Sequence, residues 1–192
     1  EGNVPYFLGL TYMQKKEYPK AAQQLEKAVA LDPNNVQYNY QLGAALERGR
    51  QLDRAESVFR KVLSLDPKHA DAYNYLGYMF AEEGVKLEEA LTLIRTALEM
   101  EPENGAFIDS LGWAYFKLGR LDEALAELLR AVKYSRREDS TIHEHLGDVY
   151  FRKGMLRDAL REWERALTLD DTSATLRQKL DDLRKRISRD GQ

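Results

Sequence analysis

A Leu-Gly pair returns five times along this chain, and the step between successive pairs is 34 or 35 residues. An alanine follows twelve positions after each glycine, or thirteen in the third copy. A period of this length indicates stacked copies of one supersecondary unit, in place of a globular domain built around a single active site. The pairs are Leu8-Gly9, Leu42-Gly43, Leu76-Gly77, Leu111-Gly112 and Leu146-Gly147, and their alanines are Ala21, Ala55, Ala90, Ala124 and Ala159.

Each copy contains two stretches in which apolar residues follow helical spacing, which predicts two helices per copy. Glycines fall where the first helix should stop, and we expect them to adopt the left-handed cap that glycine takes at little cost. These glycines are Gly49, Gly84, Gly119 and Gly154. The second helix should end before Pro33, Pro67 and Pro102, because proline disfavours a helical conformation in the residue that precedes it. The Leu-Gly glycines and their alanines are expected where the two helices cross closely.

The pattern changes after residue 173. One apolar stripe, formed by Leu176, Leu180, Leu183 and Ile187, runs along an otherwise charged segment. A single stripe is typical of a helix that seals the last hairpin and keeps its outer face in water. The alternative is a basic helix for an anionic surface, but the interleaved acids favour the capping helix.

The repeated pattern resembles the tetratricopeptide repeat (TPR). In the first copy it comprises Leu8, Gly9, Tyr12, Ala21, Leu25, Ala28 and Pro33. The last two copies depart from the pattern, since Arg136 and Asp171 stand where the closing proline is expected. The resemblance implies an all-α fold, a right-handed superhelical α-solenoid of five helix-turn-helix hairpins with a C-terminal capping helix. The expected copies span about 2–35, 36–69, 70–104, 105–139 and 140–173, followed by the capping helix at 174–189 and a tail at 190–192.

Composition narrows the kinds of partner. The net charge of the 192 residues is -3, with acids and bases interspersed, which argues against nucleic acid as a partner. Cysteine is absent, so disulfides and thiolate metal sites are excluded. No apolar run is long enough to cross a bilayer, so we expect no direct membrane insertion of this segment. The chain lacks an initiating Met and a leader, and is interpreted as a segment of a longer protein.

No motif for catalysis, for a cofactor or for a metal is found. Phosphate-binding glycine loops, the HExxH zinc motif and the GxSxG elbow are all missing. His143 and His145 are the nearest approach to a metal pair, but two residues apart on a helix they point in different directions. We interpret both as surface histidines. The sequence therefore predicts neither an enzyme nor a cofactor site.

The TPR resemblance implies a concave groove lined by the first helix of each hairpin. Its lining positions lie three before and one after the Leu-Gly glycine, with others one turn later. Several of these positions hold aromatic residues, which are common interface anchors. The alternative is that superhelical curvature buries several of these rings against neighbouring first helices. The predicted partner-binding residues are Tyr6, Leu10, Tyr40, Asn74, Tyr78, Asp109, Trp113, Phe116, Glu144, Asp148 and Phe151.

The same positions constrain the ligand. A better-known version of this groove grips a C-terminal carboxylate with basic and amide side chains, but the matching residues here cannot clamp an anion. They are Tyr6, Leu10, Gln41, Asp71 and Tyr75. We expect a protein or peptide segment with apolar side chains, with a basic residue near Asp109 and Glu144.

Three functions are compatible with these observations. The first is a non-catalytic adaptor or scaffold that holds a partner polypeptide in the groove. The second is a homo-oligomeric scaffold, such as a homodimer joined through an apolar array end, and the third is the substrate-recognition segment of a larger enzyme or protease complex. Copies three to five also resemble bacterial TPR adaptors that are exported, often as outer-membrane lipoproteins. By that analogy the periplasm or the outer membrane is favoured over the cytoplasm.

Overall fold

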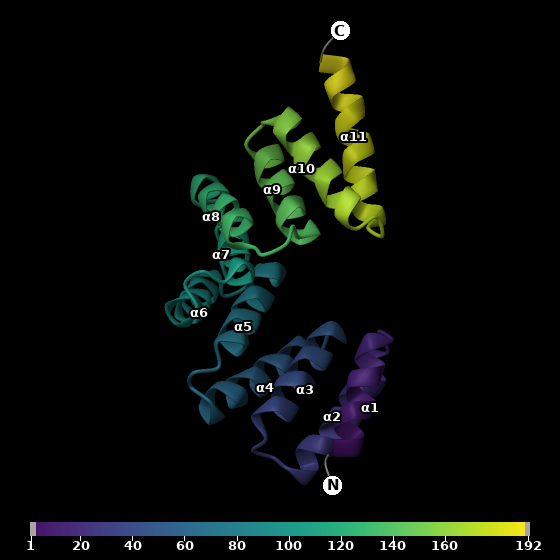
Figure 1. Ribbon diagram of the computed structural model, residues 1–192, viewed down its shortest axis with the longest axis vertical. Coiled ribbons are helices and arrows are strands. Elements are labelled where there is room, and N and C mark those ends of the chain that lie inside the picture. Colours follow the sequence, from purple (N-terminus) through teal and green to yellow (C-terminus); the bar gives the residue numbers. More distant parts are fainter. Residues whose placement is uncertain (1–2, 191–192) are drawn as a thin grey trace. The chain divides into compact units, whose positions relative to one another are not determined.

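The computed structural model describes residues 3–190, and within this range the chain forms eleven α-helices and no strand (Figure 1). The helices are α1 (Asn3–Gln14), α2 (Tyr18–Leu31), α3 (Val36–Arg48), α4 (Leu52–Leu65), α5 (Ala70–Glu83), α6 (Leu87–Met100), α7 (Gly105–Lys117), α8 (Leu121–Tyr134), α9 (Ser140–Arg152), α10 (Leu156–Leu169) and α11 (Ala174–Asp190). The predicted all-α class is confirmed. Residue 2 of the first expected copy and residues 191 and 192 of the expected tail lie outside the described range.

The chain divides into two compact units, Glu1–Met79 and Phe80–Gln192, and the boundary lies within α5. In the first unit α1 packs on α2, α2 on α3 and α3 on α4. In the second unit contacts run in order from α6 through α7, α8, α9 and α10 to α11. Within each unit, the second helix of one hairpin therefore contacts the first helix of the next.

Side-chain caps begin several of the first helices. The Asn35 side chain accepts a hydrogen bond from the backbone N–H of Tyr38, and Asn104 caps α7 in the same way. Asp139 caps α9 through the N–H of Thr141, at 2.8 Å. Such caps satisfy backbone donors that have no partner inside the helix. They fix where the helix that carries the candidate site begins.

The end of each first helix corrects one expectation. In every copy the residue seven positions after the Leu-Gly glycine has a positive φ. These residues are Lys16 (59°), Arg50 (61°), Gly84 (68°), Gly119 (76°) and Gly154 (78°). The prediction for Gly49 is wrong, since its φ is -79° and it lies one position too early. Because the repeat geometry fixes the left-handed position, Arg50 adopts it although it is not a glycine.

Four of the Leu-Gly glycines, at positions 9, 43, 112 and 147, mark close helix crossings, as predicted. A Cβ atom on Gly147 would lie 2.1 Å from Cδ1 of Trp163, and one on Gly9 would lie 2.6 Å from Cγ of Leu25. Each contact joins the first helix of a hairpin to the second helix of the same hairpin. The regular spacing also places fully buried alanines in all five second helices, at Ala21, Ala55, Ala90, Ala124 and Ala159.

Candidate functional site

All eleven predicted partner-binding residues lie on first helices, namely α1, α3, α5, α7 and α9. The structure assigns them to two groups, one in each compact unit. The first unit holds Tyr6, Leu10, Tyr40, Asn74 and Tyr78, and the second holds Asp109, Trp113, Phe116, Glu144, Asp148 and Phe151.

The residues of the first group are half-buried. The Tyr6 ring lies against Tyr38, with centroids 4.9 Å apart, and Tyr40 stacks on His69 at the same separation. Burial, together with the nearby Asp71 carboxylate, raises the pKa of Tyr40 to about 12. The Tyr40 side chain therefore stays neutral at physiological pH, and its ring packs against those of its neighbours.

Trp113 is the centre of the second group. Its indole ring stacks on Phe116 of the same helix, with centroids 4.7 Å apart, and on His145 of α9, at 4.0 Å. Its Nε1–H donates a hydrogen bond to Glu82 Oε2 at 2.6 Å. Only 7% of Trp113 is exposed, so the alternative that first helices bury a groove aromatic holds at this position. Trp113 is therefore a buried residue on which the more accessible Phe116 packs.

Asp109 is also buried, and it pairs with His145. Nδ1 of His145 lies 2.9 Å from Oδ1 and 3.1 Å from Oδ2 of Asp109. Burial alone would lower the pKa of His145, but the charge and hydrogen bond of Asp109 raise it above its ordinary value. His143 is buried too, with Nδ1 2.8 Å from Glu162 Oε2. The interpretation of both histidines as surface residues is therefore wrong.

Glu144 and Asp148 face a cation from the last helix. Nζ of Lys179 on α11 lies 3.1 Å from Glu144 Oε1 and 2.9 Å from Asp148 Oδ1. Trp163 Nε1 donates to the same Asp148 oxygen at 3.0 Å. Burial outweighs Lys179 in raising the pKa of Asp148, while the two carboxylates raise the pKa of Lys179 against the effect of its own burial. The expected basic residue of a ligand near Glu144 is thus supplied by the chain itself.

In the second group two aromatic rings remain accessible, namely Phe116, which is half-buried, and Phe151, which is 37% exposed. Cationic side chains lie over these rings and over Trp113. The Arg152 guanidinium is 5.3 Å from the Phe116 centroid, and Lys117 Nζ is 5.0 Å from that of Trp113. Arg186 of α11 lies 5.9 Å from the Phe151 centroid. The surface therefore combines apolar rings with positive charge.

Sequence reasoning missed Lys179, His145 and the cations over the rings. The signal for Lys179 was present, because Asp109, Glu144 and Lys179 are spaced at 35-residue intervals. Residues one repeat step apart occupy equivalent positions on neighbouring first helices, so α11 places Lys179 where a sixth first helix would. The absence of a Leu-Gly pair in α11 concealed this register.

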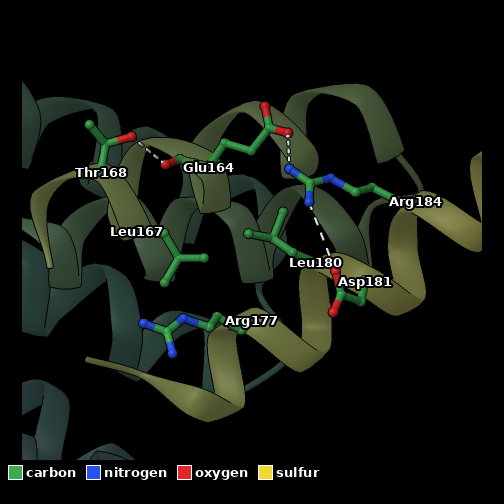
Figure 2. A pocket seen from close by; sticks show the side chains of 7 residues that line it. All are labelled: Glu164, Leu167, Thr168, Arg177, Leu180, Asp181 and Arg184. Carbon is green, nitrogen blue, oxygen red and sulfur yellow. Dashed lines mark hydrogen bonds and ion pairs between the residues drawn. The ribbon is translucent and has the colours of Figure 1, made fainter. Parts of the chain in front are cut away.

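A hollow of about 500 Å³ lies between α10 and α11 (Figure 2). Figure 2 shows Arg184 reaching toward both acids of the lining, at 2.7 Å from Glu164 and 3.8 Å from Asp181. Leu167 and Leu180 supply the apolar wall. Both acids of the lining are paired with Arg184, and Arg177 is bonded to the backbone carbonyl of Asp171. Because none of the described residues that line this hollow is aromatic, it is the weaker candidate for binding a polypeptide.

Neither a metal site nor a membrane span is found within residues 3–190. Three or more His, Cys, Asp or Glu side chains nowhere gather there in a way that could hold a metal ion. Among the helices of the same range, none is long and apolar enough to cross a membrane.

Paired helices, tight glycine crossings and a regular left-handed residue define a TPR array, and comparison with known families agrees. A family model described as TPR repeat matches residues 9–48. A second, described as tetratricopeptide repeat, matches residues 40–105, 86–133 and 110–174. The chain belongs to the tetratricopeptide repeat family, whose members are generally scaffolds for protein interactions.

Solved structures share this fold. The chain is similar to TTC0263, a thermophilic TPR protein of Thermus thermophilus, with 21% identity and a TM-score of 0.83 over 95% of this chain and 98% of that one. It is similar to PilW, a type IV pilus biogenesis factor, with 21% identity and a TM-score of 0.81 over 95% and 85% of the two chains. MamA from Desulfovibrio magneticus RS-1 has 22% identity and a TM-score of 0.71, over 91% and 97%.

Proposed function

We propose that this chain is a non-catalytic adaptor that binds a polypeptide segment of a partner protein on the first helices of its second unit. The observation that carries the proposal is the pair of accessible rings, Phe116 and Phe151, at the same register position of α7 and α9. Each lies four residues after a Leu-Gly glycine. Phenylalanine is among the residue types that are enriched in the buried centre of protein interfaces relative to the rest of the surface.

The surroundings hold these two rings in place before any ligand arrives. Phe116 is stacked on the buried Trp113, which is fixed in turn by its hydrogen bond to Glu82. Phe151 lies 5.4 Å, between centroids, from the buried Trp163. A surface whose side chains are already ordered loses little entropy when a ligand binds. This favours recognition of a flexible segment by a rigid face.

Selection from a displayed library of random short peptides tests the proposal, followed by calorimetry on the enriched peptides. The double variant Phe116→Ala/Phe151→Ala should weaken binding by about 2 kcal/mol or more, which is roughly a thirtyfold change in Kd. The helix content should stay unchanged, because neither ring is fully buried.

Leu129→Ala is the matched control, since Leu129 is an exposed apolar residue, 49% accessible, on the second helix α8. Its affinity for the enriched peptides should equal that of the unaltered chain. Failure to enrich any peptide would overturn the proposal. So would a peptide whose Kd responds to Leu129→Ala and not to the double variant.

A second candidate function, self-association, is favoured by the exposed face of α1. Val4, Phe7 and Leu8 are 70%, 61% and 44% exposed. The residues equivalent to Leu8 in the later copies are buried, namely Leu42, Leu76, Leu111 and Leu146. An apolar face of this kind is suited to pairing with another helix. Light scattering across a concentration series tests it, and a mass that stays monomeric at every concentration excludes it.

A further inference from the structure

The acidic side chains of the second unit's first-helix surface are already engaged within the chain. Asp109 is bonded to His145, and Glu144 and Asp148 are bonded to Lys179. The Glu82 carboxylate accepts the indole N–H of Trp113. A basic ligand would have to displace these internal partners. The charge pattern therefore disfavours the basic residue that the sequence alone suggested.

Two cationic side chains on the same surface, Arg152 and Lys117, are not paired with a carboxylate of the described chain. The Arg152 guanidinium is exposed and lies over the Phe116 ring, and no carboxylate of the described chain is bonded to it. Asp148 lies one turn earlier on α9 and would be its natural partner, but Asp148 is held by Lys179 and Trp163. Within residues 3–190, the hydrogen bond of Lys117 Nζ goes to the backbone carbonyl of Glu82, at 2.9 Å, and not to a carboxylate.

We propose that the segment bound on this surface is acidic, with an Asp or Glu side chain that pairs with Arg152 and a neighbouring apolar or aromatic side chain that packs on Phe116 and Phe151. The inference rests on the proposed function and specifies the chemistry of its ligand. The ligand is inferred to be negatively charged because the charged groups of this surface that lack an oppositely charged partner in the part of the chain that the structure describes, Arg152 and Lys117, are both cations.

The geometry suits a carboxylate for two reasons. A guanidinium presents N–H donors in a planar fork that matches the two oxygens of a carboxylate. The guanidinium of Arg152 already lies over the Phe116 ring. Its N–H donors are therefore held near Phe116, where an apolar side chain next to the ligand's carboxylate would pack. Lys117, over the adjacent Trp113 ring, can neutralise a second acid of the same segment. Binding should consequently weaken as salt is added.

Three probes derived from one enriched peptide test the proposal by fluorescence anisotropy. They are the peptide itself, its analogue with amides in place of carboxylates, and its analogue with lysines at the same positions. We expect the enriched sequences to be acidic and the amide analogue to bind roughly tenfold more weakly, which is the loss typical of a hydrogen bond to a charged group.

The variant Arg152→Gln should remove the preference for the acidic peptide over its amide analogue. Arg157→Gln is the matched control, because Arg157 lies on the second helix α10 and its loss changes the net charge equally. Arg157→Gln should preserve the preference. The conservative change Arg152→Lys should keep part of it, since the charge stays and the fork is lost.

The outcomes separate the two proposals. Enrichment of neutral or basic peptides that still depend on Phe116 and Phe151 would overturn the acidic ligand and leave the adaptor function standing. An acidic preference that survives Arg152→Gln would place the carboxylate elsewhere and also overturn this inference. If no peptide binds, or if binding ignores both phenylalanines, the adaptor function fails and the inference fails with it. Self-association that is abolished by Arg152→Gln would make a second copy the occupant and contradict the inference.

Discussion

The side chains of His145 and Asp109 are only 7% and 9% exposed, and they hold two first helices together. A buried ionisable group costs free energy unless it is paired and hydrogen-bonded. Here Nδ1 of His145 lies within hydrogen-bonding distance of both carboxylate oxygens of Asp109, and the imidazole ring stacks on Trp113. One residue thus joins the electrostatic and aromatic contacts between α7 and α9.

Stability should depend on the protonation of His145. Its pKa is higher in the folded chain than in the unfolded chain, where it is near 6.5. The stabilisation is therefore fully present below pH 6.5 and is lost as the pH rises through the raised folded pKa. We expect the free energy of unfolding to fall over this window by at most about 1.4 kcal/mol per pH unit. Urea unfolding at a series of pH values measures it.

Asp109→Asn provides the control, because it removes the carboxylate that raises the pKa of His145 and leaves the shape of the side chain almost unchanged. In this variant the fall in stability with rising pH should disappear. An identical slope in Asp109→Asn and in the unaltered chain would show that another group is responsible.

Contacts of this kind were hard to predict from the sequence. The TPR resemblance places Asp109 and Glu144 on the inner side of their helices, but it does not tell which neighbouring residue satisfies the charge of each. Their partners lie 36 and 35 residues away, at His145 and Lys179. Burial was the second difficulty. Trp113 and Phe116 are both aromatic and three residues apart, yet Trp113 is buried while Phe116 is half-buried. The difference comes from neighbours distant in sequence, namely His145, which stacks on Trp113, and Glu82, which accepts its N–H.

The turn inside each hairpin shares one feature of its backbone conformation in all five copies. Five residues at the same register position adopt a left-handed conformation, whether they are glycine or not. Glycine accepts this conformation freely, while other residues are strained by roughly 1–2 kcal/mol. Lys16 and Arg50 therefore carry strain that Gly84, Gly119 and Gly154 avoid.

Replacing a strained residue by glycine should stabilise the hairpin. For Lys16→Gly we expect a gain of about 0.5–1 kcal/mol, because relief of strain exceeds the greater flexibility of glycine in the unfolded chain. Lys15→Gly is the matched control, since Lys15 immediately precedes it and its φ is not positive. That change should lower the midpoint of urea unfolding. A lower midpoint for both variants would contradict the assignment of strain to Lys16.

The positions and the ends of most helices could be predicted from the sequence. The Leu-Gly spacing, the prolines and the apolar stripe of the last helix predicted the hairpins, and α2, α4 and α6 end just before the residue that precedes proline. These features are local, so each can be read without knowing its neighbours. Gly49 misled because a glycine near a helix end need not occupy the left-handed position itself.

Across the whole molecule, protection from solvent is uneven. In α7 the residues from Phe107 to Tyr115 are all buried, whereas Gly9 is the buried residue of α1. Helix α7 is contacted by both α6 and α8 within its unit. Opening of a repeat array is governed by each repeat and its nearest neighbours, so the stability of its parts can differ.

Amide hydrogen exchange followed by mass spectrometry should reveal this gradient. We expect peptides from α7 to exchange most slowly and peptides from α1 to exchange fastest, because α1 presents Val4, Phe7 and Leu8 to solvent. Peptides from α11 should be protected along its buried stripe of Leu176, Leu180 and Leu183. Equal rates for α1 and α7 would mean that the chain opens as one cooperative block, which would contradict the prediction.

The last helix also limits how a protein of this kind can grow. Helix α11 packs its apolar stripe on α10 and turns charged groups such as Arg177 and Lys185 to the solvent. The outer side of α11, as far as the structure describes it, therefore offers a further hairpin little apolar surface to pack on. A duplicated interior segment, for example residues 105–139, would instead meet apolar faces on both sides if it were inserted at its own boundary. Such an insertion would reproduce in one event the close helix crossing at Gly112 and the inward-facing carboxylate of Asp109.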